Sequence, residues 1–528
     1  MAVSKVYHLT EMPTELLLHI FSFLSPDCSV GLPACRDKFR DKPSLARLSL
    51  TSRRLRSLAQ PVLFHCFPDS HWKNPIHRLI CLARTLAARP DLAQHMKYIN
   101  IRNPLEDLDE LDDADKQYVD SELLRLGLPA IPPYWNVDGE GQYRLLPLEL
   151  LLLRTPGLVT LLLPLDYDWD LHALPQLVYH QDEGAKCHAP LLPHLRHLQV
   201  ERFFIAGDRF ESSLGPVDAL AHAAPALETL SLPTPASEDW FPSGGLRLGA
   251  LRALHFRWGV SIDAGLLAHM LAAAPWLEVL TLDLDQLAGP QERRSKSRSV
   301  EALWEVLEAR AGTLRELWLD VRAERVPPRG GRREHGLELG NGLMQTLALA
   351  QGVGAGHDLG FGQWLAQGLA SGLALEFGEE SDSEELERDS LADFEKLEVL
   401  KVDGHALSAL RRTWERKNRH PRVDGFLAGM FPPGIREVTF WRLDGLAMRA
   451  AMQEFASVVA AGEYPRLEKV RLAPSSRTDS EWGERWVNQG AWNEVVGALT
   501  EKFATGGVKF ELAAEEPYWT AGRLSVWD

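Results

Sequence analysis

A short apolar pattern, L-x-x-L-x-L, recurs along most of this 528-residue chain and limits what the chain can fold into. The alternation that closes each copy places two apolar side chains on one face of a short extended segment, which predicts a strand. Apolar segments with helical spacing precede many copies, for example Ala264–Ala274 and Val300–Ala309. Neither element can bury its apolar face alone, so the copies are expected to stack on one another.

The copies are unevenly spaced. Their first apolar residues are Leu158, Leu195, Leu227, Leu251, Leu277, Leu314, Leu397, Ile435 and Leu467, and further strands are predicted within His95–Ile101 and Val508–Leu512. Successive copies begin between 24 and 83 residues apart, whereas regular leucine-rich repeats hold near about 20–29 residues. Chance recurrence in a leucine-rich protein is the alternative, but a Pro or Gly stands just ahead of many copies. The pattern resembles an irregular leucine-rich repeat, which implies an α/β solenoid of alternating helices and short parallel strands.

The N-terminal stretch from Tyr7 to Phe67 has a different character. Within Pro13–Leu24, apolar side chains cover far more of the helical circumference than the ~100° stripe that a surface helix needs. Such a helix needs two surfaces against which to bury itself. One can come from its own small domain, and the other is expected to come from another protein. A long polar segment, Cys28–Lys42, separates this helix from the next apolar stretch and predicts an extended loop.

The spacing of this stretch resembles an F-box, the module through which substrate receptors attach to the Skp-family adaptor of SCF-type ubiquitin ligases. The family pattern L-x-x-L-P-x-E-L-L-x-x-I-F-x-x-L runs from Leu9 to Leu24, with Met12 in the place of the second leucine. The segment Leu45–Pro61 fits the closing helices of a three-helix module. By this resemblance the adaptor contacts are Pro13, Leu16, Leu17, Ile20, Phe21 and Leu24, with Leu45, Leu48 and Leu55 either in contact or in the module's own core.

These features predict two domains. Residues 1–70 form the adaptor-binding module, and residues 75–515 form the repeat-like substrate-binding domain, with a long insertion around 322–392. The insertion holds an acidic run, Glu379–Asp389, that is expected to be disordered. Ser381 and Ser383 within it would suit an acid-directed kinase, although such runs are usually only solvated spacers.

Charge and cysteine usage exclude several classes of function. A net charge of −16 argues against a nucleic-acid binder that relies on neutralising phosphates. Residues 1–70 are nevertheless basic, with nine Lys or Arg against six Asp or Glu. The five cysteines are too sparse for a disulfide framework, and no stretch predicts a signal peptide or a membrane span. We therefore expect an intracellular protein, in the cytoplasm or nucleus, that binds neither nucleic acid nor membrane.

The sequence displays no catalytic motif, and no cofactor or metal is expected. Cys187 and His188 with His194 and His197 can be drawn as a metal site, but the two later histidines flank a predicted strand. A cysteine nucleophile needs a histidine that is itself oriented by a third group, and the sequence gives no reason to choose any cysteine for that role. The interpretation is that Cys28, Cys66 and Cys81 are small apolar or loop residues.

The residue between the two core positions of each strand points away from the core. These residues and nearby tryptophans predict a surface for a protein target: His255, Trp258, Trp318, Trp441 and Arg471. The leading hypothesis is a non-catalytic substrate receptor that links an unidentified protein target, through the adaptor, to a cullin-based ligase. The alternative is a repeat scaffold that binds the adaptor or another partner without directing ubiquitination. A hydrolase would need a titratable pair in a cleft, which the sequence does not display.

Overall fold

In the computed structural model, every residue described below belongs to one compact unit, which comprises residues 1–323 and 389–528. The structure describes residues 9–24, 42–68, 75–101, 112–128, 145–165, 171, 173–182, 190–202, 215–233, 246–257, 264–284, 306–321, 391–404, 406–407, 426–441, 445–473 and 489–512. Residues 322–390, which include nearly all of the predicted insertion with Ser381 and Ser383, lie outside these ranges.

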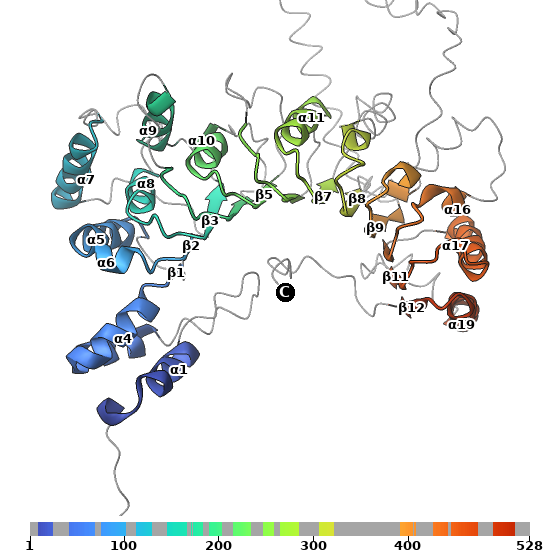
Figure 1. Ribbon diagram of the computed structural model, residues 1–528, viewed down its shortest axis with the longest axis horizontal. Helices are drawn as coiled ribbons and strands as arrows, with labels where there is room; N and C mark the ends of the chain where they lie inside the picture. The colour runs from blue at the N-terminus through green and yellow to red at the C-terminus, as the bar shows by residue number, and fades with distance from the viewer. Residues whose placement is uncertain are drawn as a thin grey trace, which may run out of the picture. The chain divides into compact units, whose positions relative to one another are not determined.

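Twelve strands form a single sheet in which each strand pairs in parallel with its neighbours in sequence, from β1 to β12 (Figure 1). The strands are β1 (Cys66–Pro68), β2 (Tyr98–Asn100), β3 (Thr160–Leu165), β4 (His197–Arg202), β5 (Thr229–Pro233), β6 (Ala253–Arg257), β7 (Val279–Leu284), β8 (Glu316–Val321), β9 (Val399–Asp403), β10 (Glu437–Trp441), β11 (Lys469–Ala473) and β12 (Lys509–Leu512). Helices and parallel strands in one sheet confirm the predicted α/β class. The first strand, β1, was not predicted.

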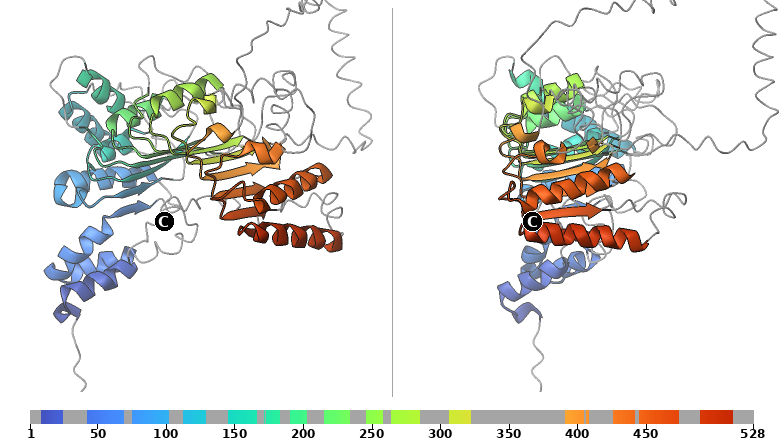
Figure 2. Two further views of the ribbon diagram at one scale, coloured as in Figure 1. Left: turned by 45° about the vertical axis from the view of Figure 1, so that its right-hand side comes forward. Right: turned by 90° about the vertical axis from the view of Figure 1, so that its right-hand side faces the viewer.

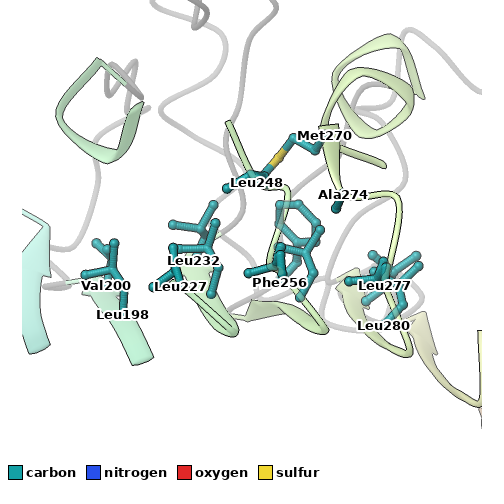
Figure 3. Packing of buried hydrophobic residues seen from close by; sticks show 14 of the residues in the cluster. Leu198, Val200, Leu227, Leu232, Leu248, Phe256, Met270, Ala274, Leu277 and Leu280 are labelled. Atoms are coloured by element: carbon teal, nitrogen blue, oxygen red, sulfur yellow. The ribbon is translucent and has the colours of Figure 1, made fainter. Parts of the chain in front are cut away.

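The register explains the recurring leucines. Leu198, Leu230, Leu254 and Leu280 are paired from strand to strand, so equivalent positions of successive copies form one continuous buried row. Figure 3 labels Leu198 and Leu280 of this row and shows Met270 of α11 (Ala264–Ala273) beside Leu248 in the same core. A strand buried along one such row stabilises its neighbours only when they are in the same register.

Helices lie along one side of the sheet (Figure 1). They are α5 (Pro75–Ala88), α6 (Pro90–Ala93), α7 (Asp113–Arg125), α8 (Leu146–Leu152), α9 (Ala173–Asp182), α10 (Gly215–Ala223), α11 (Ala264–Ala273), α16 (Phe426–Met430), α17 (Gly445–Ala460) and α19 (Gln489–Thr505), with the short 3₁₀ helix η5 (Leu391–Asp393). Figure 2 shows α17 and α19 running side by side at the red end of the chain. Phe455 of α17 meets the rings of Phe431, Tyr464 and Phe503 edge-on, with ring centroids 5.1–5.8 Å apart.

The turns before the strands account for some of the recurring glycines. A Cβ on Gly157, just before β3, would lie 2.8 Å from the carbonyl oxygen of Gln94 in the preceding repeat. A Cβ on Gly434, just before β10, would lie 3.2 Å from the carbonyl oxygen of Glu395. Stacked repeats approach each other at this turn, which leaves little room for a side chain.

The residues immediately before strands β4 to β11 are charged and form a row from strand to strand. From β4 to β11 these residues alternate between arginine and glutamate, in the order Arg196, Glu228, Arg252, Glu278, Arg315, Glu398, Arg436 and Glu468. Their backbones are joined as well, because the amide of each donates to the carbonyl of the one before it at 2.8 Å. Ion pairs at 2.8 Å join Arg252 to Glu278 and Arg436 to Glu468. We call this set the Arg/Glu ladder.

Candidate functional site

The N-terminal helices form a small module with its own core. After the 3₁₀ turn η1 (Leu9–Glu11), α1 (Thr14–Leu24) packs against both α3 (Lys42–Thr51) and α4 (Arg53–Leu63). The core is separate from that of the sheet and consists of Leu17, Phe21, Leu45, Leu55 and Ala59. Three helices were predicted for this module, and its described residues contain three α-helices.

Polar contacts fix where the helices of the module begin. Ser52 caps α4, because its hydroxyl oxygen accepts a hydrogen bond from the amide of Leu55 at 3.1 Å. The Arg54 guanidinium donates to the carbonyl of Met12 at 2.8 Å and to the hydroxyl of Thr14 at 3.3 Å. These two bonds connect the start of α4 to the start of α1.

Several large apolar side chains of the module face outward. Leu16 and Phe23, seven residues apart on one side of α1, are 49% and 72% exposed, and Leu50 at the end of α3 is 75% exposed. Leu9 and Leu18 are exposed as well. The Phe23 and His19 rings meet edge-on, with 4.7 Å between their centroids. We call the five exposed side chains Leu9, Leu16, Leu18, Phe23 and Leu50 the apolar patch, although Leu18 lies on a different side of α1 from Leu16 and Phe23.

The structure divides the predicted adaptor contacts into three groups. Leu17, Phe21, Leu45 and Leu55 are buried in the core of the module, Ile20, Leu24 and Leu48 are half-buried at its edge, and Pro13 and Leu16 are exposed. The sequence alone left open whether Leu45 and Leu55 contact the adaptor or lie in the module's own core. In the structure both lie in the core. Leu18, Phe23 and Leu50 were not among the predicted contacts. The seven-residue spacing between Leu16 and Phe23 was the signal that places Phe23 on the side of α1 occupied by Leu16.

The second candidate surface is the face of the sheet opposite the helices. The register brings Trp318, Lys401, Thr439 and Arg471 side by side across β8, β9, β10 and β11. The Lys401 ammonium lies 3.4 Å from the centre of the Trp318 ring, a cation–π contact. Burial lowers the pKa of Lys401, and the nearby Glu316 carboxylate opposes that shift.

Some polar groups at this surface have no hydrogen-bond partner. Thr439 and Trp441 are buried, and among the described residues nothing bonds the Thr439 hydroxyl or the Trp441 indole N–H. Arg471 is half-buried and donates to Glu511 at 2.8 Å. We call Trp318, Lys401, Thr439, Trp441 and Arg471 the β8–β11 patch.

The remaining predicted target-binding residues are placed differently. His255 is buried, and its Nδ1 lies 2.9 Å from the Thr281 hydroxyl, so it offers no free surface. Trp258 lies outside the described residues.

The described ranges contain no group of three or more His, Cys, Asp or Glu side chains that could hold a metal ion. Of the four residues considered for metal, Cys187 and His188 are not described. Burial and the Arg196 charge lower the pKa of His197 to about 4. Within the same ranges, no helix has the length and apolarity needed to cross a bilayer.

Comparison with known proteins agrees with the geometry of the module. Residues 9–67 match the family model described as F-box-like. The match begins at η1 and ends within β1, so it spans the helical module and its junction with the sheet. No curated protein matches the chain. The chain thus carries an F-box-like domain, and such domains typically bind Skp-family adaptors.

Proposed function

We propose that the chain is a non-catalytic substrate receptor of an SCF-type ubiquitin ligase. One observation supports this above the others: of the eight large apolar side chains exposed among the described residues, five belong to the F-box-like domain, and Leu16 and Phe23 among them share one side of α1. Exposed apolar patches typically mark protein interaction sites. In this proposal the patch docks on a Skp-family adaptor in the cytoplasm or nucleus, and the adaptor joins the chain to a cullin scaffold.

The sheet body is proposed to be a leucine-rich-repeat solenoid. Its support is the strand order, which follows the sequence from β1 to β12, together with the leucines that recur at equivalent register positions. Each repeat then contacts mainly its neighbours, and the strands present one continuous face. Insertions of different lengths between the strands account for the uneven spacing of the sequence pattern.

The body is proposed to hold the protein target, and the β8–β11 patch is its best-supported contact surface. It combines the Trp318 ring with the cationic side chains of Lys401 and Arg471 on neighbouring strands. Aromatic and cationic side chains together are typical anchors for a protein ligand. In this role the chain breaks no bond. It raises the local concentration of target lysines beside the ubiquitin-carrying subunits.

The connection between the two parts suits such a receptor. Helix α4 ends at Leu63 and β1 begins at Cys66, so two residues separate the module from the sheet. The carbonyl oxygen of His65 accepts from the amides of both Lys97 and Tyr98, at 2.9 and 3.2 Å. The chain is thus hydrogen-bonded to β2 immediately after leaving the module, which limits independent motion at this point.

The adaptor proposal is tested with the exposed side chains, because a charge at Leu17 would unfold the module. The double variant Leu16→Asp with Phe23→Asp places two charges on the apolar patch while leaving the module's core intact. We expect this variant to lose capture of a purified Skp-family adaptor by at least about tenfold, because charged groups would be desolvated in the interface. Leu124→Asp is the matched control, since Leu124 is 62% exposed on α7 of the sheet body. Undiminished capture by the double variant would exclude docking through the patch.

The second candidate function is a scaffold that binds the adaptor without directing ubiquitination. The apolar patch supports the scaffold as well as the receptor, because both functions need the adaptor to bind there. Co-purification of a cullin with the full-length chain separates the two. Adaptor together with cullin supports the receptor, whereas adaptor without cullin supports the scaffold.

A further inference from the structure

Cys81, His77 and Asp115 form a thiol–imidazole–carboxylate arrangement at the exposed side of α5. His77 and Cys81 are one turn apart on that helix, and Cys81 Sγ lies 3.5 Å from His77 Nε2. On the other side of the ring, His77 Nδ1 lies 2.6 Å from Asp115 Oδ2 on α7. Both Cys81 and His77 are exposed, so the sulfur can be reached from solvent.

The carboxylate that orients the imidazole is held firmly. Asp115 is only 1% exposed, and its other oxygen lies 2.8 Å from the Arg84 guanidinium. Its backbone amide donates to the Asp112 side chain, which caps α7. The Asp115 carboxylate accepts a hydrogen bond from His77 Nδ1–H. The neutral imidazole therefore has its lone pair on Nε2, which faces the thiol. A cysteine beside a base that a third group orients is the signature of an activated nucleophile.

We propose that Cys81 is a reactive thiol that exchanges with small-molecule disulfides and becomes the chain's site of reversible S-thiolation. The Cys81 sulfur attacks one sulfur of the disulfide, and the thiol proton passes to His77 Nε2. A new S–S bond forms to Cys81 as the S–S bond of the disulfide breaks. The departing thiolate takes the proton from the imidazolium and leaves as a thiol. One disulfide is exchanged for another, so no further oxidant is needed.

The position of Cys81 favours disulfide exchange over acyl transfer. Cys81 lies in the interior of α5, where backbone amides are already used in the bonds of the helix. Acyl transfer needs free donors directed at the developing oxyanion beside the nucleophile. Disulfide exchange has no such requirement. It needs only a deprotonated sulfur, a proton acceptor and access, and these are the features that the geometry supplies.

The test compares modification rates in the full-length reduced protein. Excess glutathione disulfide is added at pH 7, and intact mass with peptide mapping follows each cysteine over time. We expect Cys81 to be modified on the order of tenfold faster than in His77→Gln, less than the usual 10²–10⁴-fold effect of a general base because the imidazole is exposed. His269→Gln, an exposed histidine on α11, is the matched control and is expected to leave the Cys81 rate unchanged. Buried Cys66 serves as an internal slow standard.

A purely structural role for His77, as a partner of the buried Asp115, would change thermal stability without changing the Cys81 rate. Thermal unfolding of His77→Gln is therefore measured alongside. The proposal is overturned if Cys81 reacts equally fast in the wild type and in His77→Gln, or no faster than the same cysteine in an unfolded peptide of residues 75–88. Selective modification of Cys81 that depends on His77 supports it.

Discussion

Arg252 Nη1 donates to Glu278 Oε1 across 2.8 Å, joining the residues that enter β6 and β7. The pair belongs to the Arg/Glu ladder, in which each charge stands between two of the opposite sign. Glu278→Arg would place three arginines in succession, at 252, 278 and 315. We expect it to lower the free energy of unfolding by up to about 1 kcal/mol, more at low salt, because like charges on adjacent strands repel. Urea unfolding at two ionic strengths measures this, with Glu278→Gln as the uncharged control. Equal stability of the two variants at low salt would show that the ladder has no energetic role.

Leu16 and Leu17 are neighbours on α1 but differ in burial: Leu16 lies on the surface of the F-box-like domain, and Leu17 lies in its core. Leu17→Ala is expected to destabilise the module by about 2–4 kcal/mol, since it removes a fully buried side chain. Leu16→Ala is expected to change stability by less than about 0.5 kcal/mol while weakening adaptor binding. Hydrogen exchange of α3 and α4 measures the first effect, and adaptor titration measures the second. A stability loss at Leu16 as large as that at Leu17 would contradict the assignment.

His197 at the start of β4 gives the body a defined acid sensitivity. Its pKa is about 4 in the folded chain, because burial and Arg196 disfavour the imidazolium, against 6.5 ordinarily. Between these values the unfolded chain takes up a proton that the folded chain does not, so stability falls as pH drops from about 6.5 to 4. Allowing for partial exposure, the loss is on the order of 1–2 kcal/mol.

Urea unfolding at pH 7 and pH 4.5 tests this contribution of His197. His197→Gln is expected to lose less stability between the two pH values than the wild type. His194→Gln, at an exposed position three residues earlier in the turn before β4, should behave as the wild type does. Identical acid sensitivity in all three proteins would argue that His197 is not held neutral.

The β8–β11 patch is expected to decide which proteins the chain holds. Trp318→Ala combined with Arg471→Glu removes an aromatic anchor and reverses a charge, so targets recovered by proximity labelling should decline. Trp276→Ala is the matched control, because Trp276 is a 66% exposed tryptophan in the turn between α11 and β7. Both variants should still capture the adaptor. Unchanged target recovery with the double variant would place the target surface elsewhere.

The strands could be predicted because each repeats the same local rule. Leu254 is separated from the next core residue, Phe256, by the polar His255, and it follows the turn at Gly249, so the sequence contains most of the information that its repeat needs. Strand β1 breaks the rule: Cys66-Phe67-Pro68 offers a single core side chain and ends in proline. Its pairing depends on β2, which lies about thirty residues later.

The candidate sites were less accessible to sequence reasoning. Helical periodicity shows that α1 is apolar on two sides, but it cannot tell which side the other helices of the module will cover. His77 and Asp115 are 38 residues apart. Asp115 also lies in a strongly acidic stretch of the sequence, Glu106–Glu122, in which no single carboxylate stands out. Only the packing of α7 against α5 buries that carboxylate and directs it at the imidazole.

The last strand that the structure describes, β12, carries the charged residues Lys509 and Glu511, which pair in register with Lys469 and Arg471 of β11. Lys509 is exposed, and Glu511 accepts from Arg471 and lies 2.6 Å from the Lys509 ammonium. A parallel sheet built by adding one strand after another has no intrinsic length, and its final strand is a template for a strand from another molecule. Charged side chains on that strand make addition of a foreign strand costly. Among the described strands, β12 therefore discourages end-to-end pairing between copies of this chain.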